Sequence, residues 1–185
     1  FTVKNNATVT VNGNIEIGYF TQISGAMSFY KGSLSLADNA RFTATGTITV
    51  FLESALAMDY TSRLTFAGLT AQEDSITINV SGYTDGVYKV MENTGANAVD
   101  YATVISNWSE IENIGYAIVD NSLYLGKADQ ENYLVNADYS KYNFGDAIED
   151  KAGYFYGFNA FSSLDEAGRA AKEATRTITV EADLA

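Results

Sequence analysis

Three pairs of adjacent acidic residues are the groups whose type could support acid–base chemistry: Glu73-Asp74, Glu149-Asp150 and Asp165-Glu166. Glycosidases use two carboxyl groups about 5 to 10 Å apart, one of them as the acid. Adjacent residues of a strand point to opposite faces of its sheet, so such pairs make poor catalytic dyads. We therefore expect solvated loops and a helix start at these positions, and we predict no catalytic residue.

Histidine and cysteine are both absent from the 185 residues. Their absence excludes hydrolases of the Ser-His-Asp type and histidine- or cysteine-ligated zinc sites. A site that cleaves acidic polysaccharides would need basic residues gathered together, and Arg41, Arg63, Lys89 and Lys127 are scattered along the sequence. The sequence thus predicts that the chain is not an enzyme.

Four acidic residues fall within one irregular segment: Asp138, Asp146, Glu149 and Asp150. Carboxylate oxygens are ligands that Ca²⁺ accepts, and extracellular calcium sites are often weak. The segment lacks the spacing of an EF-hand loop or of a calcium-binding β-roll repeat. We predict a solvated loop without a cofactor, and weak calcium binding is the one ion interaction that the composition favours.

The charge of the chain limits its partners. It has 23 acidic and 11 basic residues, a formal net charge of −12, and no cluster of lysines and arginines. Nucleic acids and anionic membrane surfaces both need such clusters, so neither is expected as a partner. No apolar run approaches the roughly 20 residues of a membrane-spanning helix, so we expect no membrane insertion in this segment.

Short alternating segments dominate the sequence, and Ser75 to Val80 is the clearest, with Ile76, Ile78 and Val80 on one face. Similar segments recur at 7–11, 33–36, 47–52, 63–66 and 177–180, each bounded by Gly, Asn, Asp or Ser. This pattern is typical of strands joined by tight corners. The chain has no proline, which a fold of many hydrogen-bonded strands would select against.

Local turn and helix signals complete the pattern. Asn12-Gly13 fits a hairpin turn or a corner between stacked strands, and Asp120-Asn121 predicts a hairpin. Ser163-Leu-Asp-Glu166 is a capping box, which predicts a helix over residues 163–174. A terminal strand is expected at 177–182.

The fold class that we predict is all-β, as a parallel β-helix (β-solenoid) with a short C-terminal capping helix. Residues 1–126 would form the β-solenoid and residues 127–185 a capping or junction segment. A β-sandwich is the alternative, because alternation and hairpin turns fit it nearly as well.

The C-terminal half carries a resemblance, in the segments Tyr83 to Val90, Ala117 to Leu125, Tyr133 to Ala137, Gly157 to Ala167 and Thr177 to Val180. It resembles the junction between domains in large bacterial surface proteins with pectin-lyase-like, autotransporter-passenger-like β-helix repeats. The resemblance implies that the region around Gly157 and the helix after it cap the start of another β-helix, and that the chain is a piece of a longer protein. No catalytic motif of that family is matched.

The function that we predict is a structural or adhesive module of a bacterial cell-surface or extracellular protein, with self-association or neighbouring domains as partners. Edge strands pair readily with other chains, so head-to-tail assembly into filaments through the terminal strands is expected. The expected interface consists of Phe1, Thr2, Val3, Thr177, Ile178, Thr179, Val180, Glu181 and Ala182. The alternative is a polysaccharide-binding or polysaccharide-degrading module on the same scaffold, with surface glycans as ligands.

Overall fold

The computed structural model describes residues 1–23, 26–84, 86–126, 132–170 and 177–181. The chain divides into two compact units: unit 1 contains residues 1–83 and 89–125, and unit 2 contains residues 84–88 and 126–185. Strands dominate the described residues, and most of the sheets that they form are parallel. This confirms the all-β class that the sequence predicts.

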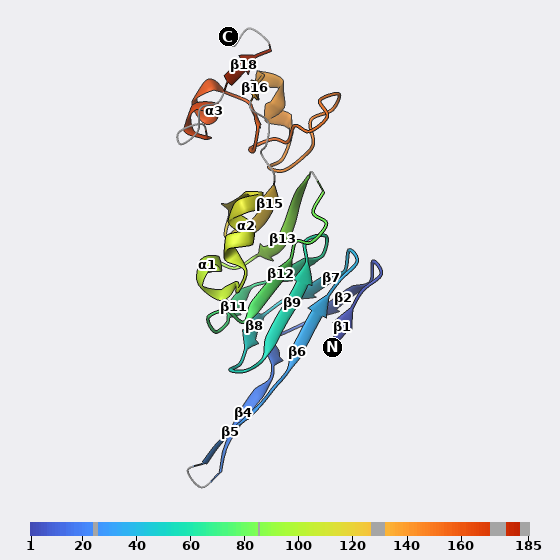
Figure 1. Cartoon of the computed structure of the whole chain (residues 1–185), viewed down its shortest axis with the longest axis vertical. Coiled ribbons are helices and arrows are strands. Elements are labelled where there is room, and N and C mark those ends of the chain that lie inside the picture. The colour runs from blue at the N-terminus through green and yellow to red at the C-terminus, as the bar shows by residue number, and fades with distance from the viewer. Residues whose placement is uncertain (24–25, 85, 127–131, 171–176, 182–185) are drawn as a thin grey trace. The chain divides into compact units, whose positions relative to one another are not determined.

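Three sheets, here called A, B and C, make up most of unit 1 (Figure 1), and only Val87, Tyr88 and Gly126 at strand ends of sheet B belong to unit 2. In spatial order, sheet A contains β1 (Thr2–Val3), β6 (Ser33–Leu36), β9 (Ala55–Asp59) and β12 (Ile76–Asn79). Sheet B contains β14 (Tyr116–Val119), β15 (Ser122–Gly126), β13 (Val87–Asn93), β10 (Arg63–Phe66), β7 (Arg41–Ala44) and β2 (Thr8–Val11). Sheet C contains β11 (Gly68–Thr70), β8 (Thr47–Val50) and β3 (Ile15–Ile17).

The chain visits the three sheets in a fixed order, A then B then C. β1, β2 and β3 make the first round, β6, β7 and β8 the second, and β9, β10 and β11 the third, after which β12 and β13 begin a fourth. We call each round a coil. Leu34 lies opposite Leu56, and Leu56 lies opposite Ile76, so the third coil is slightly shorter than the second. Strands of successive coils pair in parallel.

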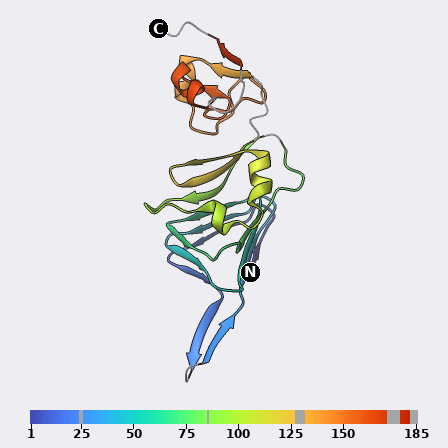
Figure 2. The ribbon, with the colours of Figure 1, turned by 60° about the vertical axis from the view of Figure 1, so that its left-hand side comes forward.

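A hairpin interrupts the first coil. β4 (Tyr19–Ile23) and β5 (Ala26–Tyr30) pair antiparallel between β3 and β6, and they form a sheet of their own. Because of this insertion, Val3 lies opposite Leu36, and the first coil is much longer than the two that follow it. Figures 1 and 2 both show the hairpin projecting away from sheets A, B and C.

Alternation along the strands builds the core of unit 1. Inward-facing residues of successive coils lie next to one another, as Phe42 does with Leu64 and Leu64 with Met91. All three are at most 3% exposed. Apolar burial contributes about 25 cal/mol per Å², so rows of large apolar side chains are the main force that holds the coils together.

The two turn signals in the sequence have different outcomes. Asn12-Gly13 is a corner, because it joins β2 of sheet B to β3 of sheet C, and Gly13 takes a φ of 138° there. Asp120-Asn121 joins β14 and β15, which pair antiparallel with Val119 opposite Ser122. The predicted hairpin at this position is confirmed.

Two short helices, α1 (Tyr101–Val104) and α2 (Trp108–Ile114), follow the fourth coil. Asp100 caps α1 by accepting a hydrogen bond from Thr103 N–H at 3.3 Å. The segment between the helices pairs with the last strand of sheet A: Ser106 N–H donates to Ile76 O at 2.8 Å, and Asn107 Nδ2 donates to Ile78 O at 2.7 Å. The helical segment therefore covers the edge of sheet A at this end of unit 1.

Unit 2 contains a parallel sheet in the order β17 (Ala160–Phe161), β16 (Asn132–Val135), β18 (Thr177–Val180), together with the short 3₁₀ helix η1 (Ala137–Lys141) and α3 (Leu164–Ala170). Its core includes Tyr133, Val135, Phe161 and Ala167.

The start of α3 follows the predicted capping box. Ser163 Oγ accepts a hydrogen bond from Glu166 N–H at 3.3 Å, and Glu166 Oε2 accepts one from the N–H of Ser162, one residue earlier than expected. The expected end of this helix, 171–174, lies outside the described residues, as does Ala182 at the end of the expected strand 177–182. β18 ends at Val180, and Glu181 follows it.

Candidate functional site

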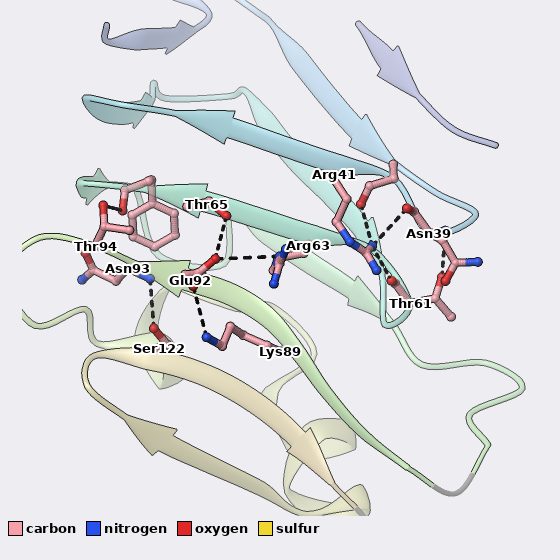
Figure 3. A network of polar contacts seen from close by, with 12 residues as sticks. Asn39, Arg41, Thr61, Arg63, Thr65, Lys89, Glu92, Asn93, Thr94 and Ser122 are labelled. Atoms are coloured by element: carbon pink, nitrogen blue, oxygen red, sulfur yellow. Dashed lines mark hydrogen bonds and ion pairs between the residues drawn. The ribbon is translucent and has the colours of Figure 1, made fainter. Parts of the chain in front are cut away.

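A network of charged side chains lies on the outer face of sheet B (Figure 3). Phe42, Leu64 and Met91 point into the core, so the residues that alternate with them point outward. Arg63 lies directly opposite Arg41, and Glu92 lies opposite Thr65. These side chains come from three successive coils.

Glu92 is the centre of this network. Its carboxylate accepts hydrogen bonds from Lys89 Nζ at 3.1 Å and from Thr65 Oγ1 at 3.1 Å, and it lies 3.8 Å from Arg63 Nε. Burial alone would raise the pKa of Glu92, but Lys89, Thr65 and Arg63 together hold that pKa below its usual value. Burial would lower the pKa of Lys89, and its contacts with Tyr124 and Glu92 more than offset this and raise it. Glu92 therefore stays ionised between two cations.

Arg41 clamps two corners of successive coils. Its Nη1 donates to Asn39 O at 3.0 Å, Ala40 O at 3.0 Å and Thr61 O at 2.9 Å. Burial, followed by the charge of Arg63, lowers the pKa of Arg41 from its usual value. Two guanidinium groups thus lie side by side, with the negative charge of Asp59 acting on Arg41 and that of Glu92 acting beside Arg63.

The structure corrects the interpretation of the basic residues as scattered. Arg41, Arg63 and Lys89 lie on one face, because the spacing between successive members is close to the length of one coil. Lys127 lies outside the described residues. The network offers two guanidinium groups and one ammonium group to an anion, with the carboxylate of Glu92 among them and that of Asp59 near Arg41.

None of the three acidic pairs forms a dyad. Glu73 and Asp74 are exposed, as are Glu149 and Asp150. Asp165 pairs with Arg169 on the surface of α3, while Glu166 caps that helix. These positions match the expected solvated loops and helix start.

The carboxylates of the acidic segment in unit 2 do not gather at one point. Asp146 accepts a hydrogen bond from Asn143 N–H at 2.8 Å, which closes a local turn. Asp138, Glu149 and Asp150 line the rim of an open polar hollow of about 420 Å³. Within the described ranges, no three acidic side chains gather closely enough to hold a metal ion.

The first coil ends all three sheets of unit 1. β1, β2 and β3 lie at the ends of sheets A, B and C, so each has one edge that no other described strand occupies. Between them lies an open apolar groove of about 320 Å³. Its lining includes Phe1, Val9, Val11, Ile15, Ile17, Leu34 and Phe42.

Burial shows why this groove exists. Ile15 and Val11 are partly exposed, whereas their neighbours in the second coil, Ile48 and Ala44, are at most 1% exposed. Phe1 is 72% exposed. Val3 and Ile17 of the first coil are buried, so it is Val9, Val11 and Ile15 that are less covered than the same positions one coil later.

The expected interface residues lie on two strands in different units: Thr2 and Val3 on β1 of unit 1, and Thr177 to Val180 on β18 of unit 2. Thr2 and Val3 pair with Ser35 and Leu36 on one edge only, as far as the described strands go. Among the same strands, β18 pairs with β16 alone, and Val180 remains 45% exposed. Both segments are edge strands, and each has a partner strand inside its own unit.

Glu181 has a role inside unit 2. It accepts hydrogen bonds from Tyr139 Oη and Lys151 Nζ. Burial would raise its pKa, but Lys151 and Tyr139 hold that pKa below the usual value, while burial and Glu181 raise the pKa of Tyr139. The side chain of Glu181 thus fastens β18 to its own unit.

Sequence reasoning missed the groove residues of β2 and β3. Val9, Val11, Ile15 and Ile17 alternate as strand residues do, but the sequence does not show that they line a groove beside which no further described strand lies. The assignment of strands to coils would have revealed it, because Ile15 belongs to the first coil and has a neighbour on one side only among the described strands.

The chain has no match among protein-family models, curated proteins or solved structures. No helix in the described part of the chain has the length and apolar character needed to span a bilayer. The coils, the groove and the network on sheet B are therefore the features that bear on function.

Proposed function

We propose that the chain is a parallel β-helix that serves as a structural or adhesive module of a bacterial cell-surface or extracellular protein. The observation that carries this proposal is the repeated order of sheets A, B and C, with parallel pairing between successive coils. A β-sandwich has two sheets of mainly antiparallel strands, so this order favours the β-helix. We assign the β-helix to residues 1–126 and a capping or junction segment to residues 127–185.

Self-association is the proposed activity of the module. Edge strands present rows of backbone donors and acceptors, and the first coil adds an apolar groove of about 320 Å³. At the other end of unit 1, the segment after α1 hydrogen-bonds to β12 and covers the edge of sheet A, while β11 and the β14–β15 hairpin end sheets C and B. The two ends of unit 1 therefore differ, and a contact between unlike ends builds a filament rather than a closed dimer.

Val180 provides a sharp test of this assembly. Glu181 N–H donates to Val135 O, so by alternation the N–H of Val180 points to the edge of β18 that faces away from β16. Val180→Pro removes that donor, while Val180→Ala shortens the side chain and keeps the donor. We expect light scattering to show large particles for the wild type and Val180→Ala, and loss of assembly for Val180→Pro.

Deletion of residues 175–185 should have the same effect as Val180→Pro. A wild-type chain that stays monomeric at high concentration, or assembly that is unchanged by both the deletion and Val180→Pro, would contradict the proposal. Circular dichroism on each variant establishes that it remains folded.

A second candidate is a polysaccharide-binding module, and the network on sheet B favours it. Arg41, Arg63 and Lys89 lie together in a chain of net charge −12, with Glu92 as the nearby carboxylate. A glycan array and an assay for released reducing sugar test this candidate. Specific binding that Arg63→Gln weakens would favour it, and inertness combined with self-association would favour the structural role.

A further inference from the structure

We propose that β18 of one copy pairs in parallel with the outer edge of β3 of a second copy. In this arrangement Ile178 lies beside Ile15, Thr179 beside Glu16 and Val180 beside Ile17. The inference rests on the proposed head-to-tail assembly, and it names the two strands that meet. The acceptor strand lies outside the interface expected from the sequence.

The first argument is a repeated tetrapeptide. β8 has the sequence Thr47-Ile48-Thr49-Val50, and β18 has the identical sequence Thr177-Ile178-Thr179-Val180. β8 already pairs in parallel with β3, with Ile48 opposite Ile15 and Val50 opposite Ile17. One edge of β3 therefore already accepts this tetrapeptide, in the register that we propose for β18 on its other edge.

The second argument is the phase of the backbone hydrogen bonds. Phe51 N–H donates to Ile17 O at 3.0 Å, so Ile17 and, by alternation, Ile15 direct their backbone groups toward β8. The N–H and C=O of Glu16 then point to the outer edge. On β18, the same alternation from Glu181 directs the N–H and C=O of Ile178 and Val180 outward.

These two sets of groups fit together. In a parallel pair, one residue donates to the residue before its partner and accepts from the residue after it. Glu16 opposite Thr179 would donate to Ile178 O and accept from Val180 N–H. A shift of register by one residue would break this match and would turn the apolar side chains of β18 outward.

The third argument is the apolar face. Ile15 and Ile17 line the open groove of the first coil. Ile178 packs against the core of unit 2, which contains Tyr133 and Phe161, and Val180 lies on the same face of β18. The proposed pairing would join the two cores side by side, while Glu16, which also borders the groove, and Thr179 are exposed and by alternation point their side chains the other way.

Direction and charge agree with this pairing. Sheet C and the sheet of unit 2 are each entirely parallel, and a parallel pair of β3 and β18 would continue that direction through both. Residues 1–37 contain Lys4, Lys31 and a single acid, Glu16, in a chain with 23 acidic and 11 basic residues. The strongly acidic remainder of a second copy therefore meets a region that does not repel it.

Engineered disulfides test the register, because the chain has no cysteine of its own. Chains with Glu16→Cys are mixed with chains with Thr179→Cys and oxidised gently. Residues opposite each other in a sheet have Cα atoms within the range of about 4.4 to 6.8 Å that a disulfide spans. Matched controls replace Glu16→Cys by Thr2→Cys on β1 or Thr10→Cys on β2, the edge strands of sheets A and B.

We expect the Glu16 and Thr179 pair to give the crosslinked dimer at least tenfold faster than either control pair. Equal or faster crosslinking through Thr2→Cys or Thr10→Cys would overturn the inference and leave the head-to-tail assembly intact. A wild-type chain that light scattering finds monomeric would overturn both. Fluorescence of Trp108 and circular dichroism establish that each cysteine variant is folded.

Discussion

Replacement of isoleucine by alanine at two neighbouring positions of sheet C measures how open the first coil is. Ile15 and Ile48 lie opposite each other on β3 and β8, but Ile48 is 0% exposed and Ile15 is partly exposed. Truncation of a buried isoleucine costs about 2 to 5 kcal/mol, because a cavity adds to the lost transfer free energy. We expect Ile48→Ala to lower the free energy of unfolding by about 3 to 4 kcal/mol.

The cost at Ile15 should be smaller in the monomer. The change removes three carbon groups worth about 0.8 kcal/mol each when fully buried, and Ile15 is partly exposed, so most but not all of that burial is realised at the open end. No closed cavity forms there, so we expect Ile15→Ala to cost about 1.5 to 2 kcal/mol. In assembled material the cost should approach that of Ile48→Ala, because β18 of a second copy would cover Ile15.

Guanidinium titration at low protein concentration measures both values. Trp108, the single tryptophan, packs against Tyr116 within unit 1, with 4.6 Å between the ring centres, so its fluorescence reports the unfolding of that unit. The difference between the two variants should be about 2 kcal/mol, which is well outside the error of linear extrapolation. Equal costs for the two monomeric variants would refute the claim that Ile15 is less covered than Ile48.

Three further replacements test the remaining contacts. Glu92→Gln leaves Arg63 and Lys89 without their shared carboxylate and should cost about 1 kcal/mol in urea titration, because the pairs are partly exposed. The folded-state pKa of Glu92 is lowered, so its contribution to the free energy of unfolding is fully present above the ordinary glutamate pKa, about 4.3. That contribution is lost as the pH falls through the lowered pKa. A series of unfolding titrations of the wild type at decreasing pH that shows no such loss would contradict this. Asn159→Ala removes a fully buried amide that binds two backbone groups, and a drop in thermal stability equivalent to about 2 to 3 kcal/mol is expected. Glu181→Gln should speed hydrogen exchange in β18, and unchanged exchange would show that this carboxylate does not fasten the strand.

Local patterns predict much of the secondary structure. The alternating segments at 33–36 and 63–66 coincide with β6 and β10, the segment at 47–52 contains β8, which ends at Val50, and the hairpin at Asp120-Asn121 forms as expected. These predictions hold because alternation and turn chemistry act over a few residues. They do not depend on which strands later become neighbours.

The coil length could not be obtained in the same way. The second and third coils differ slightly in length, and the first is much longer because β4 and β5 are inserted, so no constant period exists in the sequence. For the same reason Arg41, Arg63 and Lys89 looked scattered. Once the coil length is known, their spacing places them on adjacent strands of sheet B.

Helices α1 and α2 were missed for a different reason. They have four and seven residues, which is too short for a helical period to show in the sequence. Asp100 caps α1 by accepting a hydrogen bond from Thr103 N–H, and an aspartate at this position is a local signal of a helix start. Such Asx turns are common in loops as well. Their position depends on tertiary contacts, since Tyr101 and Ile111 are at most 1% exposed.

The difference between the two ends of unit 1 decides which assembly is compatible with the strands. Two first coils that met face to face around a two-fold axis would bring β3 against β3 in antiparallel orientation, and the groove of each copy would face another groove. Neither groove would then receive an apolar strand of the kind that β8 supplies one coil later. β18 supplies such a strand in parallel orientation, and it leaves the first coil of its own copy open for another β18. The same contact could therefore repeat, so the proposed β3–β18 pairing predicts a polar filament and not a two-fold symmetric dimer.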